Sequence, residues 1–395
     1  MKHVLSILIS ILLLSACGFK APKDYVPTEQ EVQEYKAADW ASKATDMKFD
    51  NVFSDPEKAI EYLSKAIVMD PSEAHYYFNR ALAYTLIDKN QDAIDDYTTA
   101  ISIDNDFEDA LHGRAVTYKK MQEIGKAIED YTRLTELKPN EETYYIQRGV
   151  LFYILEDNQK AIEDFSQVIS INPAMPIAYA LRADSKIREK MYASAVKDLN
   201  EAITLNSRES RYYFQRGLLH EHMHNDRLAM QDFQEMYTQE PTHLGAAMAL
   251  ARITATSKDK SLHVPAQSIP AARRAVKLTK RENPLALQLL AASLADAGSF
   301  RLAELAQQEA LRKIPEGSVQ MQNQARFLLN RYAKQLKFTH PPSVENTSPF
   351  AINSDIPPVI PNEMGHENNN SPKEKAATEQ TMQPDEPKSK VKAFF

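Results

Sequence analysis

The sequence predicts an all-α protein built as a solenoid of helical hairpins. A period of 34 residues runs through the middle of the 395-residue chain and repeats an arginine, an aspartate and an alanine. A fixed period of this length indicates one supersecondary unit per period, whose apolar face only its neighbours can bury. We therefore expect an extended binding surface rather than an enclosed catalytic site. The repeated residues are Arg80, Arg114, Arg148, Arg182 and Arg216, and Asp96, Asp130, Asp164, Asp198 and Asp232.

The first 17 residues have the composition of a secretory signal. A short basic start precedes an apolar run over residues 4–14. The run is too short for a membrane span, because a spanning helix needs about 20 apolar residues. It ends in Leu-Ser-Ala-Cys at residues 14–17, which resembles the lipobox of bacterial lipoproteins. The resemblance implies cleavage before Cys17 and acylation there, and several acyl chains hold a protein on a membrane. The alternative is an ordinary secreted protein whose leader contains a cysteine.

Cys17 is the only cysteine in the chain, so no disulfide framework is available. It is followed by Gly18. In lipoproteins of Gram-negative bacteria, a residue other than aspartate at this place implies sorting to the outer membrane. The resemblance therefore implies an outer-membrane protein that faces the periplasm, or a cell-membrane lipoprotein in another type of envelope. Residues 18–27 are expected to form a tether.

A divergent first unit is expected over residues 28–73. Its first helix begins after Thr28, which can form a capping box with Glu31. Its second helix has Asp55 as the N-cap residue, with a proline at the first helical position. We expect a loop over residues 49–54 between the two helices.

Five regular units follow, from Ala74 to His243, and each predicts two antiparallel helices. Small residues at the eighth and twentieth positions let the helices approach closely, and large residues at the fourth and twenty-fourth fill the space beside them. In three units a proline at the thirty-second position ends the second helix. The twentieth position is always alanine, at Ala93, Ala127, Ala161, Ala195 and Ala229.

This spacing resembles the tetratricopeptide repeat, in which a large-x-x-x-small first helix is followed by an A-x-x-x-F second helix and a proline. The resemblance is strongest over residues 74–243. It implies a solenoid of about seven repeat units that binds protein or peptide partners.

The register weakens after residue 243, and residues 244–337 are expected to form divergent units and a capping helix. The final stretch is apolar on one side and rich in Gln, Asn and Arg on the other, as a solvated end cap requires. The first divergent unit has a helix over 244–253, a loop over 257–268 and a helix over 271–280, the second spans 284–317, and the cap spans 319–336.

Residues 338–395 are expected to be a disordered tail. They contain nine of the 21 prolines and no periodic apolar pattern, so they cannot bury enough apolar area to offset the entropy of ordering. Within them, residues 356–361 could form a polyproline II ligand for a partner. A plain linker or tail is favoured.

The repeated arginine departs from the family pattern, in which the seventh position is usually leucine. A semi-buried arginine needs a counter-charge, because one unpaired buried charge costs about 3 to 5 kcal/mol. Two pairings are open: with the aspartate of the same repeat, or between one repeat's aspartate and the next repeat's arginine. The neighbouring units lack both residue types together, which favours structural ion pairs within each repeat. The alternative is a basic stripe that grips an anionic ligand.

The family resemblance also implies where a ligand would bind. Positions 2, 5, 9, 12 and 13 of the first helix would line the binding face, and an apolar or amphipathic segment would fit there. The alternative is that these residues pack only against neighbouring helices. On the binding interpretation, Val150→Asp weakens partner capture without unfolding the protein. The expected contact residues are Phe78, Leu82, His112, Val116, Ile146, Val150, Tyr153, Phe214 and Leu218.

Signals for chemistry are weak. The sequence has no G-x-S-x-G, no H-E-x-x-H and no glycine-rich phosphate loop. The segment His220-Glu221-His222-Met223-His224 contains residues that ligate zinc, but His220 occupies a normally packed position, so a structural role is favoured. No cofactor, metal site or enzymatic activity is expected.

The net charge of -7 provides no electrostatic footprint for nucleic acid. The sequence therefore favours a membrane-anchored adaptor that docks other proteins on the periplasmic side. It resembles repeat lipoproteins that organise cell-wall hydrolases and proteases. The alternatives are a pilotin-like assembly factor for a secretin or pilus and, less favoured, an enzyme of unrecognised type. The oligomeric state stays open, and a homodimer through the terminal helices is one of the states allowed.

Overall fold

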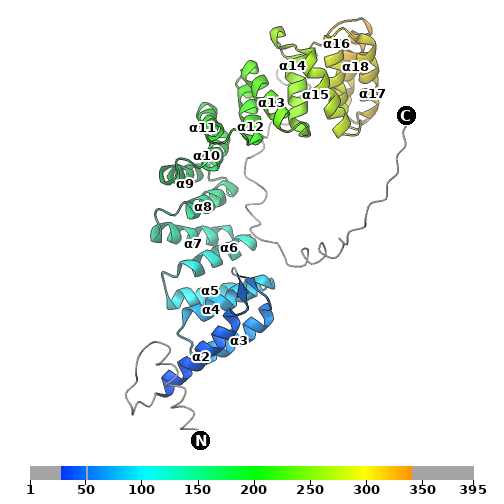
Figure 1. Ribbon diagram of the computed structural model, residues 1–395. Coiled ribbons are helices and arrows are strands. Elements are labelled where there is room, and N and C mark those ends of the chain that lie inside the picture. Colours follow the sequence, from blue (N-terminus) through cyan, green and yellow to red (C-terminus); the bar gives the residue numbers. More distant parts are fainter. Residues whose placement is uncertain (1–27, 50–51, 340–395) are drawn as a thin grey trace, which may run out of the picture. The chain divides into compact units, whose positions relative to one another are not determined.

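The computed structural model describes residues 28–49 and 52–339. The expected signal sequence with Cys17, the tether and nearly all of the expected tail lie outside these residues. Within them the chain is helical apart from one short hairpin, and successive helices form antiparallel pairs (Figure 1). The predicted all-α solenoid of helical hairpins is confirmed.

Each regular unit forms one helical hairpin. Its first helix begins at the first residue of the 34-residue period, and its second helix begins at the seventeenth. Side-chain periodicity therefore sets both helix starts. The pairs are α4 (Ala74–Leu86) with α5 (Asn90–Ile103), α6 (Glu108–Lys120) with α7 (Ile124–Leu137), α8 (Glu142–Ile154) with α9 (Asn158–Ile171), α10 (Pro176–Arg188) with α11 (Tyr192–Leu205), and α12 (Ser210–His222) with α13 (Asp226–Gln239).

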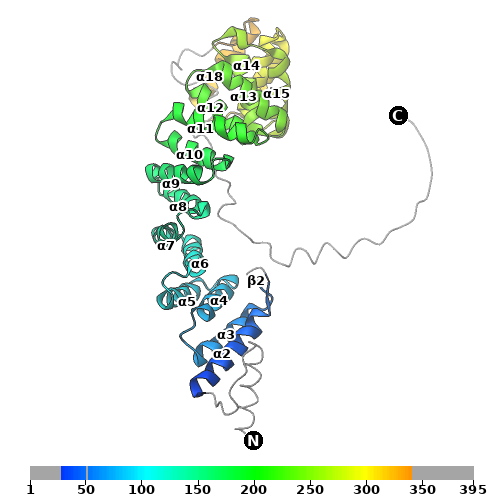
Figure 2. The ribbon, with the colours of Figure 1, turned by 60° about the vertical axis from the view of Figure 1, so that its left-hand side comes forward.

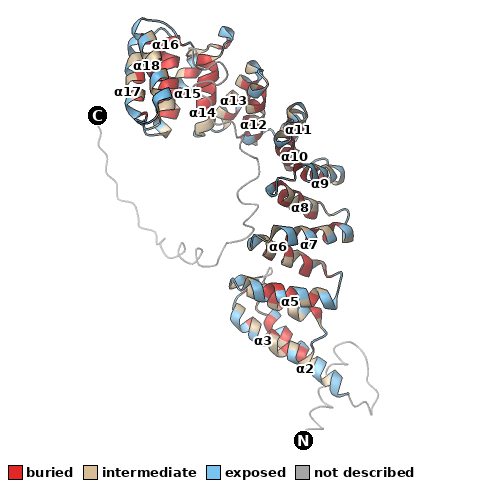
Figure 3. Cartoon of the chain, turned by 180° about the vertical axis from the view of Figure 1, so that it is seen from behind, coloured by how far each residue is buried: buried red, intermediate tan, exposed pale blue. Residues whose placement is uncertain are grey.

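The two helices of a pair meet where a small residue faces a large one. All five alanines at the twentieth position are fully buried, as are the large residues four positions later. Two repeats have glycine at the eighth position because an aromatic ring fills the space of a methyl group. A Cβ atom on Gly149 would lie 2.8 Å from the Phe165 ring, and one on Gly217 would lie 2.7 Å from the Phe233 ring. Figure 3 shows the buried residues gathered on the facing sides of the helices.

The turn inside each hairpin needs one residue in the left-handed region. This residue recurs every 34 positions with φ between 58° and 63°. None of the five is a glycine, so each turn carries some backbone strain. In the second divergent unit the same place is taken by Gly298, at φ 76°. The five residues are Asp88, Gln122, Glu156, Lys190 and His224.

The first unit pairs α2 (Glu29–Thr45) with α3 (Pro56–Met69). The expected capping box of Thr28 and Glu31 is present, and Asp55 caps α3 by accepting a hydrogen bond from the Lys58 backbone. The expected loop between the helices instead contains two short antiparallel strands, β1 (Lys48–Phe49) and β2 (Val52–Phe53). Figure 2 shows β2 near α4, against which it packs.

The divergent units differ from the sequence prediction at one boundary. Helix α14 (Leu244–Thr256) is followed by a short 3-10 helix, η1 (Lys260–Leu262), and by α15 (Pro265–Leu278). A loop over residues 257–268 and a helix over 271–280 were predicted, whereas the helix begins at residue 265. Pro265 in fact occupies the first helical position, where a missing N–H costs nothing, and Pro270 lies inside the helix.

The last unit pairs α16 (Pro284–Asp296) with α17 (Phe300–Lys313), and α18 (Val319–Ala333) packs on α17. The buried side of α18 consists of Ala325, Leu328 and Tyr332. Leu336, expected on this apolar side, lies beyond the helix and is exposed.

The glycine contacts predict opposite outcomes for two similar substitutions. Gly149→Ala should lower the free energy of unfolding by about 1 to 3 kcal/mol, because the added methyl group overlaps Phe165. Gly125→Ala in α7 meets open space, and better helix propensity should keep stability unchanged or raise it by up to about 1 kcal/mol. Urea unfolding followed by circular dichroism measures both. Equal effects of the two substitutions would contradict this packing.

Candidate functional site

The repeated arginines and aspartates form five bidentate ion pairs, each within one repeat. The Nε and Nη2 atoms of the arginine donate to the two carboxylate oxygens of the aspartate sixteen residues later, at 2.6–3.0 Å. The aspartates are buried, whereas the arginine side chains keep a small exposed fraction. Of the two pairings left open by the sequence, the structure shows the one within a repeat.

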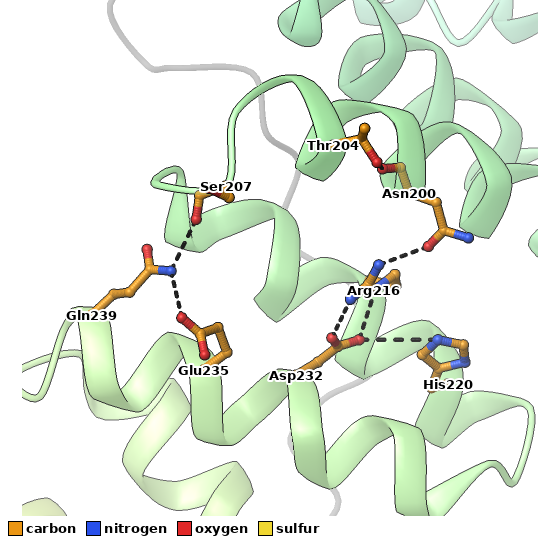
Figure 4. Close-up of polar contacts among 8 residues, drawn as sticks. All are labelled: Asn200, Thr204, Ser207, Arg216, His220, Asp232, Glu235 and Gln239. Carbon is orange, nitrogen blue, oxygen red and sulfur yellow. Dashed lines mark hydrogen bonds and ion pairs between the residues drawn. The ribbon is translucent and has the colours of Figure 1, made fainter.

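The remaining guanidinium nitrogen reaches the preceding repeat. Nη1 of Arg80 donates to Ser64 Oγ at 3.0 Å, and Nη1 of Arg216 donates to Asn200 Oδ1 at 2.7 Å (Figure 4). These acceptors were not predicted from the sequence, although most of them keep the same 34-residue spacing. Arg148 is the exception, because it uses Thr135 in place of the residue at the repeated position. The other acceptors are Thr98 for Arg114 and Ser166 for Arg182.

Aromatic rings cover the arginines. In four repeats the tyrosine at the fourth position lies 5.6–5.8 Å from the guanidinium carbon, a cation–π distance. The second repeat has Leu111 there, and Tyr118 covers Arg114 instead. Burial raises the pKa of Asp96, Asp130, Asp164 and Asp232, and the hydrogen bonds from the arginines oppose this shift. The pairs are thus enclosed structural groups rather than a stripe open to an anionic ligand.

His220, which was considered as a zinc ligand, occupies the eleventh position of its repeat. His220 is buried, its Nε2 lies 4.0 Å from Asp232, and burial lowers its pKa (Figure 4). In the preceding repeat Lys186 occupies the same position and forms an ion pair with Asp198 at 2.7 Å. The ring of His222 instead lies tilted against the ring of Tyr192, with ring centroids 4.5 Å apart. Within the described ranges, no group of three metal-ligating side chains is placed to hold a metal ion.

The expected ligand contacts differ widely in exposure. Val116 is 39% exposed, and four others are partly exposed: Leu82, His112, Ile146 and Leu218. The remaining four are buried, so the face is not the continuous exposed apolar stripe that the sequence suggested. They are Phe78, Val150, Tyr153 and Phe214.

Parts of the chain that the repeat pattern did not reveal cover three of these side chains. Lys48 of the hairpin lies 5.4 Å from the Phe78 ring and donates to Asn79 at 2.9 Å. Arg188 lies 3.9 Å above the Tyr153 ring. The ring of His243, which caps α14, lies edge-on to Phe214 at 5.1 Å. Each cover comes from a neighbouring unit, which single-repeat patterns cannot show.

The expectation for Val150→Asp needs correction. The side chain is only 7% exposed, so an aspartate there would place an unpaired charge in the packed interface and destabilise the protein. Loss of binding in that variant could not be separated from loss of structure.

Polar contacts also cross between consecutive first helices. Lys119 Nζ donates to Gln147 at 3.0 Å, and Gln215 donates to the buried Asp184 at 2.6 Å. Glu221 pairs with the buried Arg252 of the next unit. These contacts join one first helix to the next.

The first-helix face does not continue into the divergent units. Residues 246–256 of α14 and 286–296 of α16 are buried without interruption. His263, beyond η1, and Lys337, beyond α18, both contact Asp296 at the end of α16. A ligand would therefore not meet an accessible first-helix face at α14 or α16.

Exposed apolar side chains gather instead at the turn inside the hairpins of repeats three and four. Ile154 and Leu155 are 53% and 52% exposed, and Met191 is 46% exposed. Arg188, which covers Tyr153, links the end of α10 to α8. Asn158 of α9 donates to Glu189 at 3.0 Å and joins the two turns. We name Ile154, Leu155, Arg188 and Met191 the turn-edge surface; it combines three apolar side chains with one cation.

Comparison with known families identifies the repeats. The tetratricopeptide repeat family model matches residues 53–106, 108–141 and 142–175. These residues are tetratricopeptide repeats. The family match and the pattern of helical hairpins agree with the resemblance drawn from the sequence. No curated protein matches the chain.

Parts of the chain are similar to solved structures at low identity. YrrB, described as having an unusual peptide-binding site, is 17% identical, with a TM-score of 0.43, and the match covers 48% of this chain and 98% of YrrB. The pilF protein of Pseudomonas aeruginosa is 16% identical, with a TM-score of 0.41 and coverages of 54% and 96%. A protein from Parabacteroides merdae is 20% identical, with a TM-score of 0.41 and coverages of 77% and 98%.

The ion pairs predict a position-specific loss of stability. Asp164→Ala leaves the Arg148 guanidinium in a mostly buried site without its carboxylate, and the free energy of unfolding should fall by about 3 kcal/mol. Glu163→Ala, at the exposed neighbouring residue, is the matched control and should change stability by less than about 0.5 kcal/mol. Denaturant unfolding provides the comparison. An unchanged midpoint for Asp164→Ala would show that the pair has no structural role.

Proposed function

We propose that this protein is a membrane-anchored scaffold that docks other proteins through its regular tetratricopeptide repeats. Tetratricopeptide repeats mediate protein and peptide binding, and the scaffold is typically non-catalytic. The observation that carries the docking proposal is the turn-edge surface, where three large apolar side chains stay exposed although the rest of the repeat is well packed. Exposed apolar clusters of this kind mark interaction sites.

The chemistry of this surface suggests the kind of segment it binds. Ile154, Leu155 and Met191 favour apolar side chains of a partner. Arg188 forms no ion pair within the described part of the chain, so its guanidinium can donate hydrogen bonds to a carboxylate of a partner. An amphipathic segment with apolar and acidic residues would satisfy both.

Membrane anchoring rests on the sequence of residues 1–17. The lipobox resemblance at Cys17 supports an acyl anchor, and Gly18 supports the outer membrane with the repeats on the periplasmic side. None of the described helices is long and apolar enough to cross a bilayer. An anchored array would concentrate its clients at the membrane.

The docking proposal predicts that Ile154→Asp/Leu155→Asp reduces partner capture at least about tenfold, because apolar contacts at an interface centre contribute more than about 1 kcal/mol. Both side chains point mainly into water, so the fold should be retained. Cross-linking in membranes followed by quantitative mass spectrometry measures capture, and circular dichroism checks the fold.

Leu228→Asp is the matched control, since Leu228 is 45% exposed but lies on the second helix of another repeat. Capture equal to that of the wild-type protein in the double variant, or an equal loss in the control, would reject the turn-edge surface. Recovered cell-wall hydrolases would favour an adaptor, whereas secretin subunits would favour an assembly factor.

The anchoring proposal predicts that Cys17→Ser moves the protein from the membrane fraction to the soluble fraction. The reason is that the serine cannot take the thioether-linked acyl group, and a few acyl chains at about 0.8 kcal/mol per buried methylene hold the protein on the bilayer. Fractionation and immunoblotting measure the distribution. Retention of the variant on membranes would overturn the anchor while leaving the docking proposal intact.

A further inference from the structure

Charge is divided unevenly between the two ends of the helical array. Residues 28–243 carry 24 lysines and arginines against 39 aspartates and glutamates. Residues 244–339 carry 15 lysines and arginines against six acidic residues. The modest net charge of the whole chain hides this division. The end of the array therefore presents a field of opposite sign to that of the repeats before it.

The positive charge is concentrated at the C-terminal end of α15. Residues 260–281 contain six lysines and arginines and no acidic residue. Arg273 and Lys277 are exposed one helical turn apart on α15, and Lys280 is exposed in the turn that follows the helix. We call these three residues the basic face.

The basic face has no counter-charge of its own. The neighbouring arginines already have partners, since Arg274 donates to the Pro241 carbonyl and Arg281 pairs with Glu309. Within residues 28–49 and 52–339, none of the three basic-face residues forms an ion pair or a side-chain hydrogen bond. Arg281, which follows α15, pairs with Glu309 of α17, and Leu302 and Leu305 of the same helix are about half exposed.

A segment of opposite charge lies on the second helix of the first regular repeat. Residues 88–109 contain eight acidic residues and a single lysine. Asp92, Asp95 and Asp104 are exposed on or beside α5, and Ile103 on the same helix is exposed as well. No ion pair of the described residues joins this acidic segment to residues 260–281 of the same chain. The acidic segment thus carries charge and an apolar side chain complementary to the end of the array.

We propose that the basic face of α15 docks the acidic segment around α5 of a second copy of this chain. The contact joins two different surfaces, so it is head to tail. In a pair, one copy keeps its acidic segment unused and the other keeps its basic face unused. The exposed leucines of α17 and the exposed Ile103 of α5 provide apolar area beside the charges. This self-association does not depend on the turn-edge surface or on the acyl anchor.

Sedimentation velocity tests the proposal with the full chain carrying Cys17→Ser, so that acylation cannot contribute. The chain should self-associate at about 50 mM salt and dissociate at about 300 mM, because the shorter Debye length weakens contacts between exposed charges. Reversal of the basic face (Arg273→Glu/Lys277→Glu/Lys280→Glu) and reversal of the acidic segment (Asp92→Lys/Asp95→Lys/Asp104→Lys) should each weaken association at least about tenfold.

Mixing the two reversed variants distinguishes this contact from a general charge effect. Each variant alone has two faces of the same sign, whereas faces of opposite sign meet again in the mixture, so the mixture should form a complex that neither variant forms alone. The control reversal Lys126→Glu/Lys160→Glu/Lys197→Glu, at exposed positions of other second helices, should associate like the wild-type protein.

Three outcomes would overturn the proposal. They are a wild-type chain that stays monomeric at low salt, a mixture of the two variants that does not form the complex, and association that the control abolishes as strongly. Binding of the chain to vesicles of anionic lipid that depends on the basic face, without self-association, would assign the face to a membrane and reject the second copy.

Discussion

The bidentate pair between a buried aspartate and a covered arginine constrains the whole regular array. Its carboxylate is almost without solvent, so it is stable as an ion only while both oxygens receive hydrogen bonds. One guanidinium satisfies this need and also reaches a polar side chain of the preceding repeat. Each arginine therefore joins three helices, and its planar fork permits little variation in how they meet.

This constraint removes the repeated charges from the list of ligand-binding groups. The arginines and aspartates are enclosed between helices and under aromatic rings, so recognition has to use other side chains. The first-helix face offers less than the repeat pattern suggests, because neighbouring units cover Phe78, Tyr153 and Phe214. The exposed apolar residues Leu155 and Met191 lie at turns between the helices of a pair.

Several features could be predicted because they depend on local spacing. The capping box at Thr28, the helix starts at every period and the pairing of Arg80 with Asp96 all follow from residues close in sequence or fixed by the period. The acceptors at Ser64 and Asn200 had a sequence signal, since most of them keep the same period. The start of α15 at Pro265 was not predicted from the sequence, although the first helical position tolerates proline.

The sequence by itself determined the repeat unit, its two helices and the charges that hold it together, because these are properties of one period repeated many times. Only the tertiary structure decided which side chains stay accessible. The burial of Val150, the hairpin over Phe78 and the uncovered basic face of α15 depend on what the adjacent unit places opposite each residue. That information is absent from any single period, since a solenoid buries each unit only through its neighbours.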